Sequence, residues 1–348
     1  MHKIAFRVQA THGASSRLRR SLALAAGFME SDPSCTIEFL LSGAESACAA
    51  VRRAGHGCRH LGNGSLPSWN LEATESAVEE LGPDMLVVDD ANIDGRFLSE
   101  LGLKTFLALM DDNLQLEGYP AGAIVNPNIN AHTRTYPATE PAALLTGTEF
   151  VALSGEFDGY QEFVRVNPER ARRILVDFSG PDSEGSALAA VRLLKTLPEH
   201  FLAEVAVGPG FMHGEALARE IGLDERFMVV GGEAGRPKRM AAADLAICPP
   251  DMTFYESLLF GLPCALVIGS EDGCATLAEY ASGNGFALCL GEAGGLDTEA
   301  AKLLQGMISD KAARDRMSAR TTDLVDGLGR FRLADELLGL CCGQGESI

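Results

Sequence analysis

The stretch ADLAICPPDMTFYESLLFGLPCALVIG, residues 243–269, reads as a strand, a turn, a helix and a second strand in immediate succession. A short apolar run ends at Cys248, a Pro-Pro-Asp turn follows, and a helical stretch leads through Gly-Leu-Pro into a second apolar run. Strands joined by a helix run parallel in one sheet. The stretch therefore predicts a βαβ unit within an α/β domain.

The same alternation extends through the rest of the chain. Continuous apolar runs of the kind found in parallel sheets covered on both faces alternate with helical patterns; they lie at 36–41, 84–90, 104–112, 122–127, 173–180, 202–208 and 226–232. This alternation of apolar runs and helical patterns stops in the polar segment 158–172 and begins again at Arg173. We predict two α/β domains, 1–165 and 166–340, with parallel sheets facing an interdomain cleft and a last helix able to cross back.

Composition narrows the classes of partner. The 348 residues carry 29 basic and 48 acidic side chains, and the net charge of -19 argues against nucleic-acid and anionic-membrane binding. No apolar run approaches the roughly 20 residues of a membrane span. We expect a cytoplasmic protein without a transmembrane segment, with a small-molecule partner, and with most of its nine cysteines buried as thiols.

Two interpretations fit the helix start in the opening stretch. Thr253 can cap the helix with Glu256 in its first turn, although Asp251 and Met252 compete for the cap position. A carboxylate at the start of a helix after a strand is also well placed to accept both hydroxyls of a ribose. The sequence pattern does not decide between helix capping and nucleotide binding.

A second candidate site lies near the first predicted strand, where residues 3–28 read as a strand, a small-residue loop and a helix able to hold a phosphate. His12 lies in the loop, and Arg17 and Arg19 lie at its exit. A histidine can act as a general base near neutral pH, whereas an arginine stays charged and clamps phosphate. The Asp-Asp pairs at 89–90 and 111–112 are typical of caps, so we expect no metal there.

Several segments together resemble the UDP-sugar hydrolases of pseudaminic-acid biosynthesis and the related spore-coat polysaccharide proteins. That family is itself similar to the glycosyltransferase that adds N-acetylglucosamine to the peptidoglycan lipid precursor. The segments are FRVQATHGASSRLRRSLALA (6–25), DMLVVDDANID (84–94), LMDDN (109–113), IVNPNINA (124–131), DFSGPDSEG (177–185) and MAAADLAICPPDMTFYESLLFGLPCALV (240–267). The resemblance implies a GT-B fold of two Rossmann-like domains, with no cofactor or metal. It implies that the C-terminal domain binds UDP through Gly180, Asp182, Thr253, Tyr255 and Glu256.

The chain also departs from that family. A histidine of the first loop activates water in the hydrolases, and Arg17 occupies the corresponding position here. His12 is a replacement candidate, and Asp89 or Asp111 is a candidate base for a transfer reaction. Asp251 replaces a glycine beside the implied diphosphate, which its charge would repel.

The function expected from these features is chemistry at the anomeric carbon of a UDP-linked amino sugar, in surface-glycan or nonulosonic-acid biosynthesis. The reaction is transferase-like or hydrolase-like, and the acceptor is unknown. The alternative is a catalytically degenerate nucleotide-sugar-binding or scaffold protein, because the water-activating histidine and the glycine of the diphosphate turn are both replaced.

Overall fold

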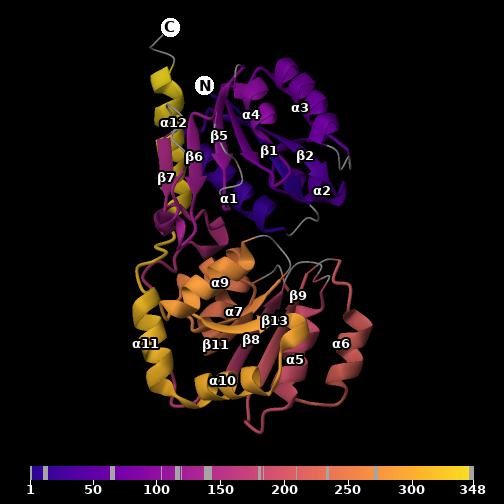
Figure 1. Ribbon diagram of the computed structural model, residues 1–348, viewed down its shortest axis with the longest axis vertical. Coiled ribbons are helices and arrows are strands. Elements are labelled where there is room, and N and C mark those ends of the chain that lie inside the picture. Colours follow the sequence, from indigo (N-terminus) through magenta and orange to yellow (C-terminus); the bar gives the residue numbers. More distant parts are fainter. Residues whose placement is uncertain are drawn as a thin grey trace. The chain divides into compact units, whose positions relative to one another are not determined.

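The computed structural model describes residues 2–10, 15–62, 67–102, 104–113, 118, 120–136, 143–178, 182, 184–208, 210–232, 235–269 and 273–344. The chain divides into two units: unit 1 comprises residues 1–155 and 327–348, and unit 2 comprises residues 156–326 (Figure 1). The boundary expected at residue 165 from the sequence thus lies inside unit 2.

Unit 1 is built on a seven-stranded sheet in the order β3-β2-β1-β4-β5-β6-β7, in which every described strand pair is parallel. The strands are β1 Lys3–Ala10, β2 Thr36–Gly43, β3 Gly57–His60, β4 Met85–Asp89, β5 Phe106–Met110, β6 Ala123–Asn126 and β7 Ala143–Thr146. The central strands β4, β5 and β6 are buried along their whole length. Burial on both faces explains their continuous apolar sequences.

The helices of unit 1 cover both faces of this sheet. They are α1 Ser16–Ser31, α2 Ser46–Arg53, α3 Pro67–Leu81, α4 Gly95–Gly102 and α12 Gly329–Gln344. Side chains alternate across β1, so Ile4, Phe6 and Val8 join the core with α1 and α12. Ala5 joins the second core with α3 and α4 on the opposite face.

The last helix, α12, belongs to unit 1 and packs against α1. The contact is close at Gly27, where an added Cβ would lie 2.5 Å from the carbonyl oxygen of Arg330. Only glycine allows the two backbones to approach this closely. The end of the described chain is thereby part of the core that the first strand forms.

Unit 2 repeats the architecture with six parallel strands in the order β10-β9-β8-β11-β12-β13. The strands are β8 Arg173–Phe178, β9 Leu202–Val207, β10 Phe227–Gly231, β11 Leu245–Cys248, β12 Cys264–Ile268 and β13 Leu288–Glu292. The helices are α5 Ser186–Lys195, α6 Gly214–Ile221, α7 Arg236–Ala242, α8 Met252–Leu258, α9 Cys274–Gly283, α10 Thr298–Ser309 and α11 Lys311–Thr321. The prediction of two parallel α/β sheets is confirmed.

The polar segment that separates the two sheets in sequence is held by unit 2. Rings of Phe157, Tyr160 and Phe163 surround Phe260, with centroid distances of 6.1, 5.1 and 5.4 Å. Arg165 donates hydrogen bonds to the backbone oxygens of Phe260, Ala243 and Met240 at 2.8, 2.5 and 2.8 Å. These contacts explain why residues before 165 belong to unit 2 although their composition resembles a linker.

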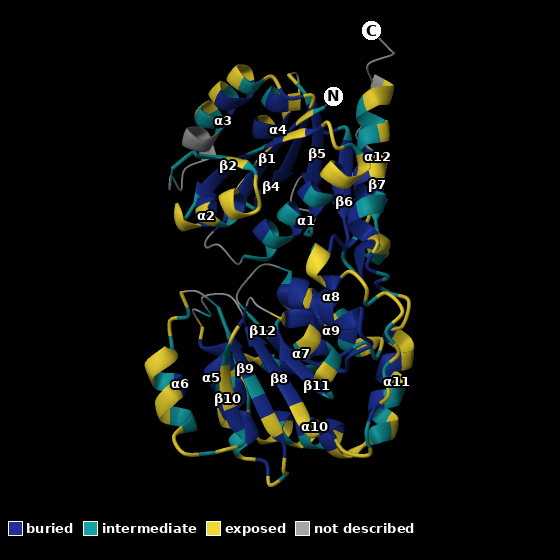
Figure 2. Cartoon of the chain, turned by 180° about the vertical axis from the view of Figure 1, so that it is seen from behind, coloured by how far each residue is buried: buried dark blue, intermediate teal, exposed yellow. Residues whose placement is uncertain are grey.

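Exposure follows the layers of each unit. Figure 2 shows the central strands buried and the outer faces of helices such as α2 and α6 exposed. Five of the nine cysteines are buried, and Cys342 is exposed. None of the helices in the described part of the chain is both long enough and apolar enough to span a bilayer.

Candidate functional site

Both sheets reverse their strand order at one point. In unit 1 the chain proceeds outward from β1 to β3 and then returns to add β4 on the other side of β1. In unit 2 the corresponding neighbours are β8 and β11. Open α/β sheets bind ligands outside the carboxyl ends of their strands at such a point. Each unit carries a cluster of buried charged side chains there.

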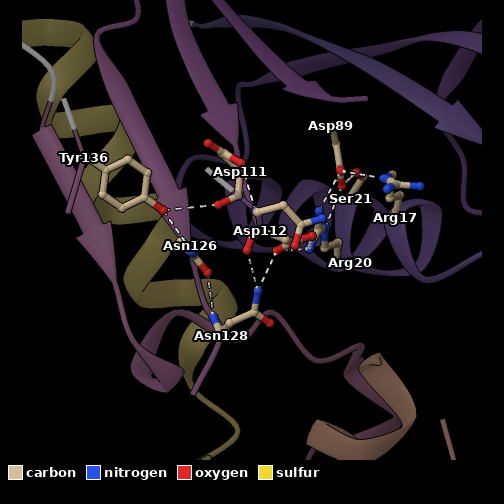
Figure 3. Close-up of polar contacts among 10 residues, drawn as sticks. Arg17, Arg20, Ser21, Asp89, Asp111, Asp112, Asn126, Asn128 and Tyr136 are labelled. Carbon is tan, nitrogen blue, oxygen red and sulfur yellow. Dashed lines mark hydrogen bonds and ion pairs between the residues drawn. The ribbon is translucent and has the colours of Figure 1, made fainter. Parts of the chain in front are cut away.

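The cluster of unit 1 is centred on Arg20 in α1 (Figure 3). Its Nε and Nη2 donate to the two oxygens of Asp89, the last residue of β4, each at 2.7 Å. Its Nη1 lies 2.7 Å from an oxygen of Asp112, which follows β5. One guanidinium therefore joins the first helix to the ends of two neighbouring strands.

Burial and charge act in opposite directions on this arginine. Burial alone would lower the pKa of Arg20, but the charges of Asp112 and Asp89 outweigh it and raise the pKa above its ordinary value. The Nε of Arg17 lies 3.7 Å from the same Asp89, and the Arg17 side chain remains 28% exposed. Arg20 is thus fixed within the cluster, whereas Arg17 reaches solvent from its edge.

Amides and a phenol extend the cluster toward β6. Asn128 Nδ2 donates to Asp112 Oδ1 at 3.2 Å, and Asn126 Oδ1 accepts the backbone N–H of Asn128 at 3.1 Å. Asn126 Nδ2 donates to Tyr136 Oη at 2.8 Å, and that hydroxyl donates to the backbone oxygen of Asp111 at 3.3 Å. Burial raises the pKa of Tyr136 to about 12, so its phenol is neutral at physiological pH.

A second ion pair lies nearby in the same unit. Arg7 of β1 is fully buried, and its Nη1 lies 2.9 Å from Asp90 Oδ2. Arg7 also donates to the hydroxyls of Thr74 at 3.1 Å and Ser42 at 2.9 Å. Burial lowers the pKa of this guanidinium, and the attraction of Asp90 offsets part of the shift. Arg7 was not predicted from the sequence, although an arginine inside an apolar strand run requires a buried carboxylate partner.

The cluster of unit 2 joins three elements through Arg236, the first residue of α7. Its Nη1 lies 2.9 Å from an oxygen of Asp177 in β8, and its Nη2 pairs with Glu256 Oε2 in α8. Nη2 also lies 3.4 Å from the hydroxyl of Thr253. Burial alone would lower the pKa of Arg236, but Asp177 and Glu256 raise it above its ordinary value.

The structure settles which residue caps the start of α8. Asp251 is the N-cap, and its Oδ1 accepts the backbone N–H of Thr253 at 2.7 Å. Of the three residues that compete for the cap position in the sequence, the structure selects Asp251, whose charged carboxylate is a stronger acceptor than the Thr253 hydroxyl. Glu256 lies beyond the first turn. Its environment is the buried pair with Arg236 rather than a capping box.

Asp182 lies three residues before Gly185, the N-cap of α5, and accepts hydrogen bonds from the start of this other helix near the same edge. Its two oxygens accept the backbone N–H groups of Ser186 at 2.7 Å and Ala187 at 2.9 Å at the start of α5. Burial raises the pKa of Asp182, while these hydrogen bonds counteract the shift. A carboxylate of the chain itself therefore occupies the helix N-terminus that a phosphate would use.

The remaining predicted site residues are placed as follows. Tyr255 is buried, with its ring centroid 5.5 Å from that of Phe254. His12 and Gly180 lie outside the described residues. Sequence reasoning missed Arg236 and its partner Asp177. An arginine at the first position of a helix opposes the helix dipole, and this was the available signal that a buried carboxylate faces it.

No model of a known protein family matches the chain. The uncharacterized protein MJ1062 of Methanocaldococcus jannaschii is 22% identical over 203 residues, which cover 56% of this chain and 42% of that protein. The match thus spans less than half of that relative.

Solved structures of other proteins are similar to this structure over nearly the whole chain. MurG of Acinetobacter baumannii gives a TM-score of 0.67 at 16% identity, covering 97% of this chain and 100% of MurG. CalG4, the calicheamicin glycosyltransferase, gives a TM-score of 0.66 at 14% sequence identity. S. aureus MnaA, in a co-structure with UDP, gives a TM-score of 0.65 at 14% sequence identity. Both alignments cover 98% of this chain and 98% of the other protein. The chain has the GT-B fold. At these identities the likeness is one of fold.

Each cluster offers a distinct chemical capacity. In unit 2, a buried glutamate fixed by an arginine presents acceptor oxygens that suit vicinal hydroxyls. In unit 1, arginines of α1 that pair with carboxylates at the ends of the strands suit an anionic or oxygen-rich group. Ion pairs within each cluster hold these groups in place.

Proposed function

We propose that the protein is a cytoplasmic enzyme that binds a UDP-linked amino sugar and acts at its anomeric carbon, as a glycosyltransferase-like or hydrolase-like enzyme of surface-glycan or nonulosonic-acid biosynthesis. The observation that carries the proposal is the buried Glu256 at the carboxyl edge of the unit 2 sheet, held by Arg236. A carboxylate has about four acceptor sites on its two oxygens, and in the proposal Glu256 accepts the ribose hydroxyls in addition to its pairing with Arg236. Calorimetric titration with UDP tests this directly.

Charged side chains of unit 2 would both repel and attract the diphosphate of a bound UDP. Asp251 at the start of α8 repels an anion there, but its charge also contributes to the raised pKa of Arg236, which places a permanent cation in the same electrostatic environment. In the proposal Arg236 offsets part of the repulsion. Thr253, whose hydroxyl lies beside Arg236, is assigned to the diphosphate side of the nucleotide.

Unit 1 is assigned to the sugar or the acceptor. Arg17 is the member of its cluster that combines partial exposure with an ion pair to Asp89. Asp89 uses both oxygens to hold Arg20, so accepting a proton would break a bidentate pair. We therefore assign Asp89 to positioning the two arginines, and Arg17 to the phosphate or sugar.

The relatives by fold support this class of ligand. S. aureus MnaA was solved with UDP, and CalG4 is described as a glycosyltransferase. The proposal that unit 2 binds a nucleotide is consistent with the descriptions of both proteins.

A degenerate binding or scaffold protein is the second candidate. Carboxylates of the chain itself accept backbone N–H groups at the starts of two helices, Asp251 as the N-cap of α8 and Asp182 in front of α5. A phosphate arriving at either helix start must compete with these acceptors. A scaffold protein of this kind would lack UDP affinity, whereas a degenerate nucleotide-sugar-binding protein would bind UDP but release none from a UDP-linked sugar, with or without an added acceptor.

We expect slow release of UDP when the purified protein receives a UDP-linked amino sugar in water alone. Arg17 cannot take a proton from water, and general-base assistance contributes about 10²- to 10⁴-fold to rate. A retained nucleotide site does not replace that contribution, because equal binding of substrate and transition state leaves the chemical step unchanged.

UDP release is measured beside a histidine-bearing hydrolase, and the variants Arg17→His and His12→Ala provide the comparison. Brisk hydrolysis by the unmodified protein, abolished in His12→Ala, would contradict the account and assign the base to His12. Release that requires an added acceptor hydroxyl supports the transferase form of the proposal.

A further inference from the structure

A cluster of potential metal ligands lies at the amino ends of β1 and β2 in unit 1, whereas the charged cluster around Arg20 lies at the carboxyl ends. His2 directly precedes β1, Asp32 is the C-cap of α1, and Cys35 directly precedes β2. One donor atom from each of the three residues lies within 4.8 Å of the others. The three come together because α1 returns the chain to the edge of the sheet where β1 began.

Backbone contacts hold the three residues in place. The backbone N–H of Thr36 donates to the oxygen of His2 at 2.9 Å, and that of Cys35 donates to the oxygen of Asp32 at 3.0 Å. Asp32 Oδ1 accepts the N–H and the hydroxyl of Ser34 at 2.9 and 2.7 Å, while its Oδ2 lies 3.2 Å from His2 Nδ1. The carboxylate thus presents one oxygen to the imidazole and uses the other to fix its own orientation.

A fourth side chain contacts the far nitrogen of the imidazole. Cys342 Sγ, from α12, lies 3.3 Å from His2 Nε2. Histidine ligands usually donate their second N–H to a neighbouring acceptor, which fixes the tautomer and the ring orientation. Cys342 occupies the position of that acceptor when Nδ1 faces Asp32 and Cys35.

We propose that His2 Nδ1, Asp32 Oδ2 and Cys35 Sγ form a binding site for Zn²⁺. One nitrogen, one oxygen and one sulfur donor suit zinc, whereas Mg²⁺ and Ca²⁺ require oxygen ligands. Three protein ligands leave the fourth tetrahedral position to water. The site is independent of the nucleotide proposed for unit 2.

Binding changes the protonation of the cluster in a defined way. Zinc is bound by the thiolate form of cysteine, so Cys35 gives up its thiol proton to solvent when the metal binds. Nδ1 gives its lone pair to the metal, and the imidazole keeps one proton on Nε2, facing Cys342. The metal then links the first strand, the first helix and, through His2, the last helix.

Titration of the full untagged chain with Co²⁺, used as a spectroscopic probe of the zinc site, tests the proposal. We expect one equivalent to bind with a thiolate-to-cobalt charge-transfer band, and Zn²⁺ to displace it. Cys35→Ser should abolish the band, and His2→Gln and Asp32→Asn should each weaken binding at least about 10-fold. The control Cys289→Ser, a partly exposed cysteine in unit 2, should leave binding unchanged.

Circular dichroism of each variant establishes that it folds. Should Cys35→Ser not fold because Cys35 is buried, His2→Gln and Asp32→Asn decide the outcome, since both side chains are partly exposed. The proposal is overturned if the unmodified chain binds neither ion stoichiometrically. It is equally overturned if folded His2→Gln and Asp32→Asn retain full affinity, or if the band depends on Cys289.

Discussion

Replacing Asp89 with asparagine is expected to lower the free energy of unfolding of unit 1 by about 3–5 kcal/mol, the usual cost of removing one partner from a buried ion pair. Asp89 is 1% exposed and accepts two hydrogen bonds from Arg20. The amide keeps the shape of the carboxylate but removes its charge and one acceptor oxygen. Arg20 then remains buried with Asp112 as its partner in the cluster.

The measurement is urea unfolding of the full chain followed by the fluorescence of its single tryptophan, Trp69, which belongs to unit 1. The control is Asp112→Asn, because Asp112 pairs with the same arginine but is 27% exposed. We expect the control to lose no more than about 1 kcal/mol. Equal losses in the two variants would show that the buried bidentate pair is not the main support of this cluster.

The second large effect concerns ligand affinity. Glu256→Ala is expected to weaken UDP binding by about 1–3 kcal/mol, which is about 5- to 150-fold in Kd, because it removes charged acceptors for the ribose hydroxyls. The variant should also lose the ability to distinguish UDP from 2′-deoxy-UDP. Calorimetry with both nucleotides measures the two effects.

A stability measurement separates this role from a purely structural one. Glu256→Ala also removes a carboxylate partner from the buried Arg236, so its Tm falls under either interpretation. Glu225→Ala removes the same charge from an exposed position before β10, at the amino edge of the same sheet, and serves as the matched control for UDP affinity. A lower Tm with unchanged UDP affinity would leave Glu256 as the partner of Arg236 alone.

Most strands that the sequence predicts are more buried than those that it does not predict, although the partly exposed edge strand β10 was also recognisable as the apolar run 226–232. The central strands β4, β5 and β11 are fully buried and were recognisable as apolar runs. The strands β3, β7 and β13 were not predicted, and each lies at an edge of its sheet with mostly partial exposure. An edge strand buries less surface, so its residues need not be apolar, and the periodic signal weakens.

Some residues of the candidate site could be predicted from the sequence and others could not. The segments that carry the family resemblance supply Asp89, Asp112 and Asn128, and the structure brings these residues together around Arg20. Arg236 was not predicted because its partners are far away in sequence: Asp177 is separated from it by 59 positions. Local patterns identify a helix start, but they do not identify the buried charge that faces it.

The capping of α8 shows a further limit of local patterns. Asp251, Met252 and Thr253 each fit the cap position in the sequence, and the structure selects Asp251. The selection depends on where the Pro-Pro turn ends the preceding segment, which fixes the first residue with helical backbone. Glu256 pairs with Arg236 and does not cap the helix, and its role in nucleotide binding stays a prediction.

Calorimetric titration of the unmodified chain with UDP tests the central claim most directly. The account predicts saturable binding of one equivalent of UDP, with weaker binding of 2′-deoxy-UDP because Glu256 accepts the ribose hydroxyls. Absence of heat and of any Tm shift at millimolar UDP, or equal affinity for the two nucleotides, would contradict it.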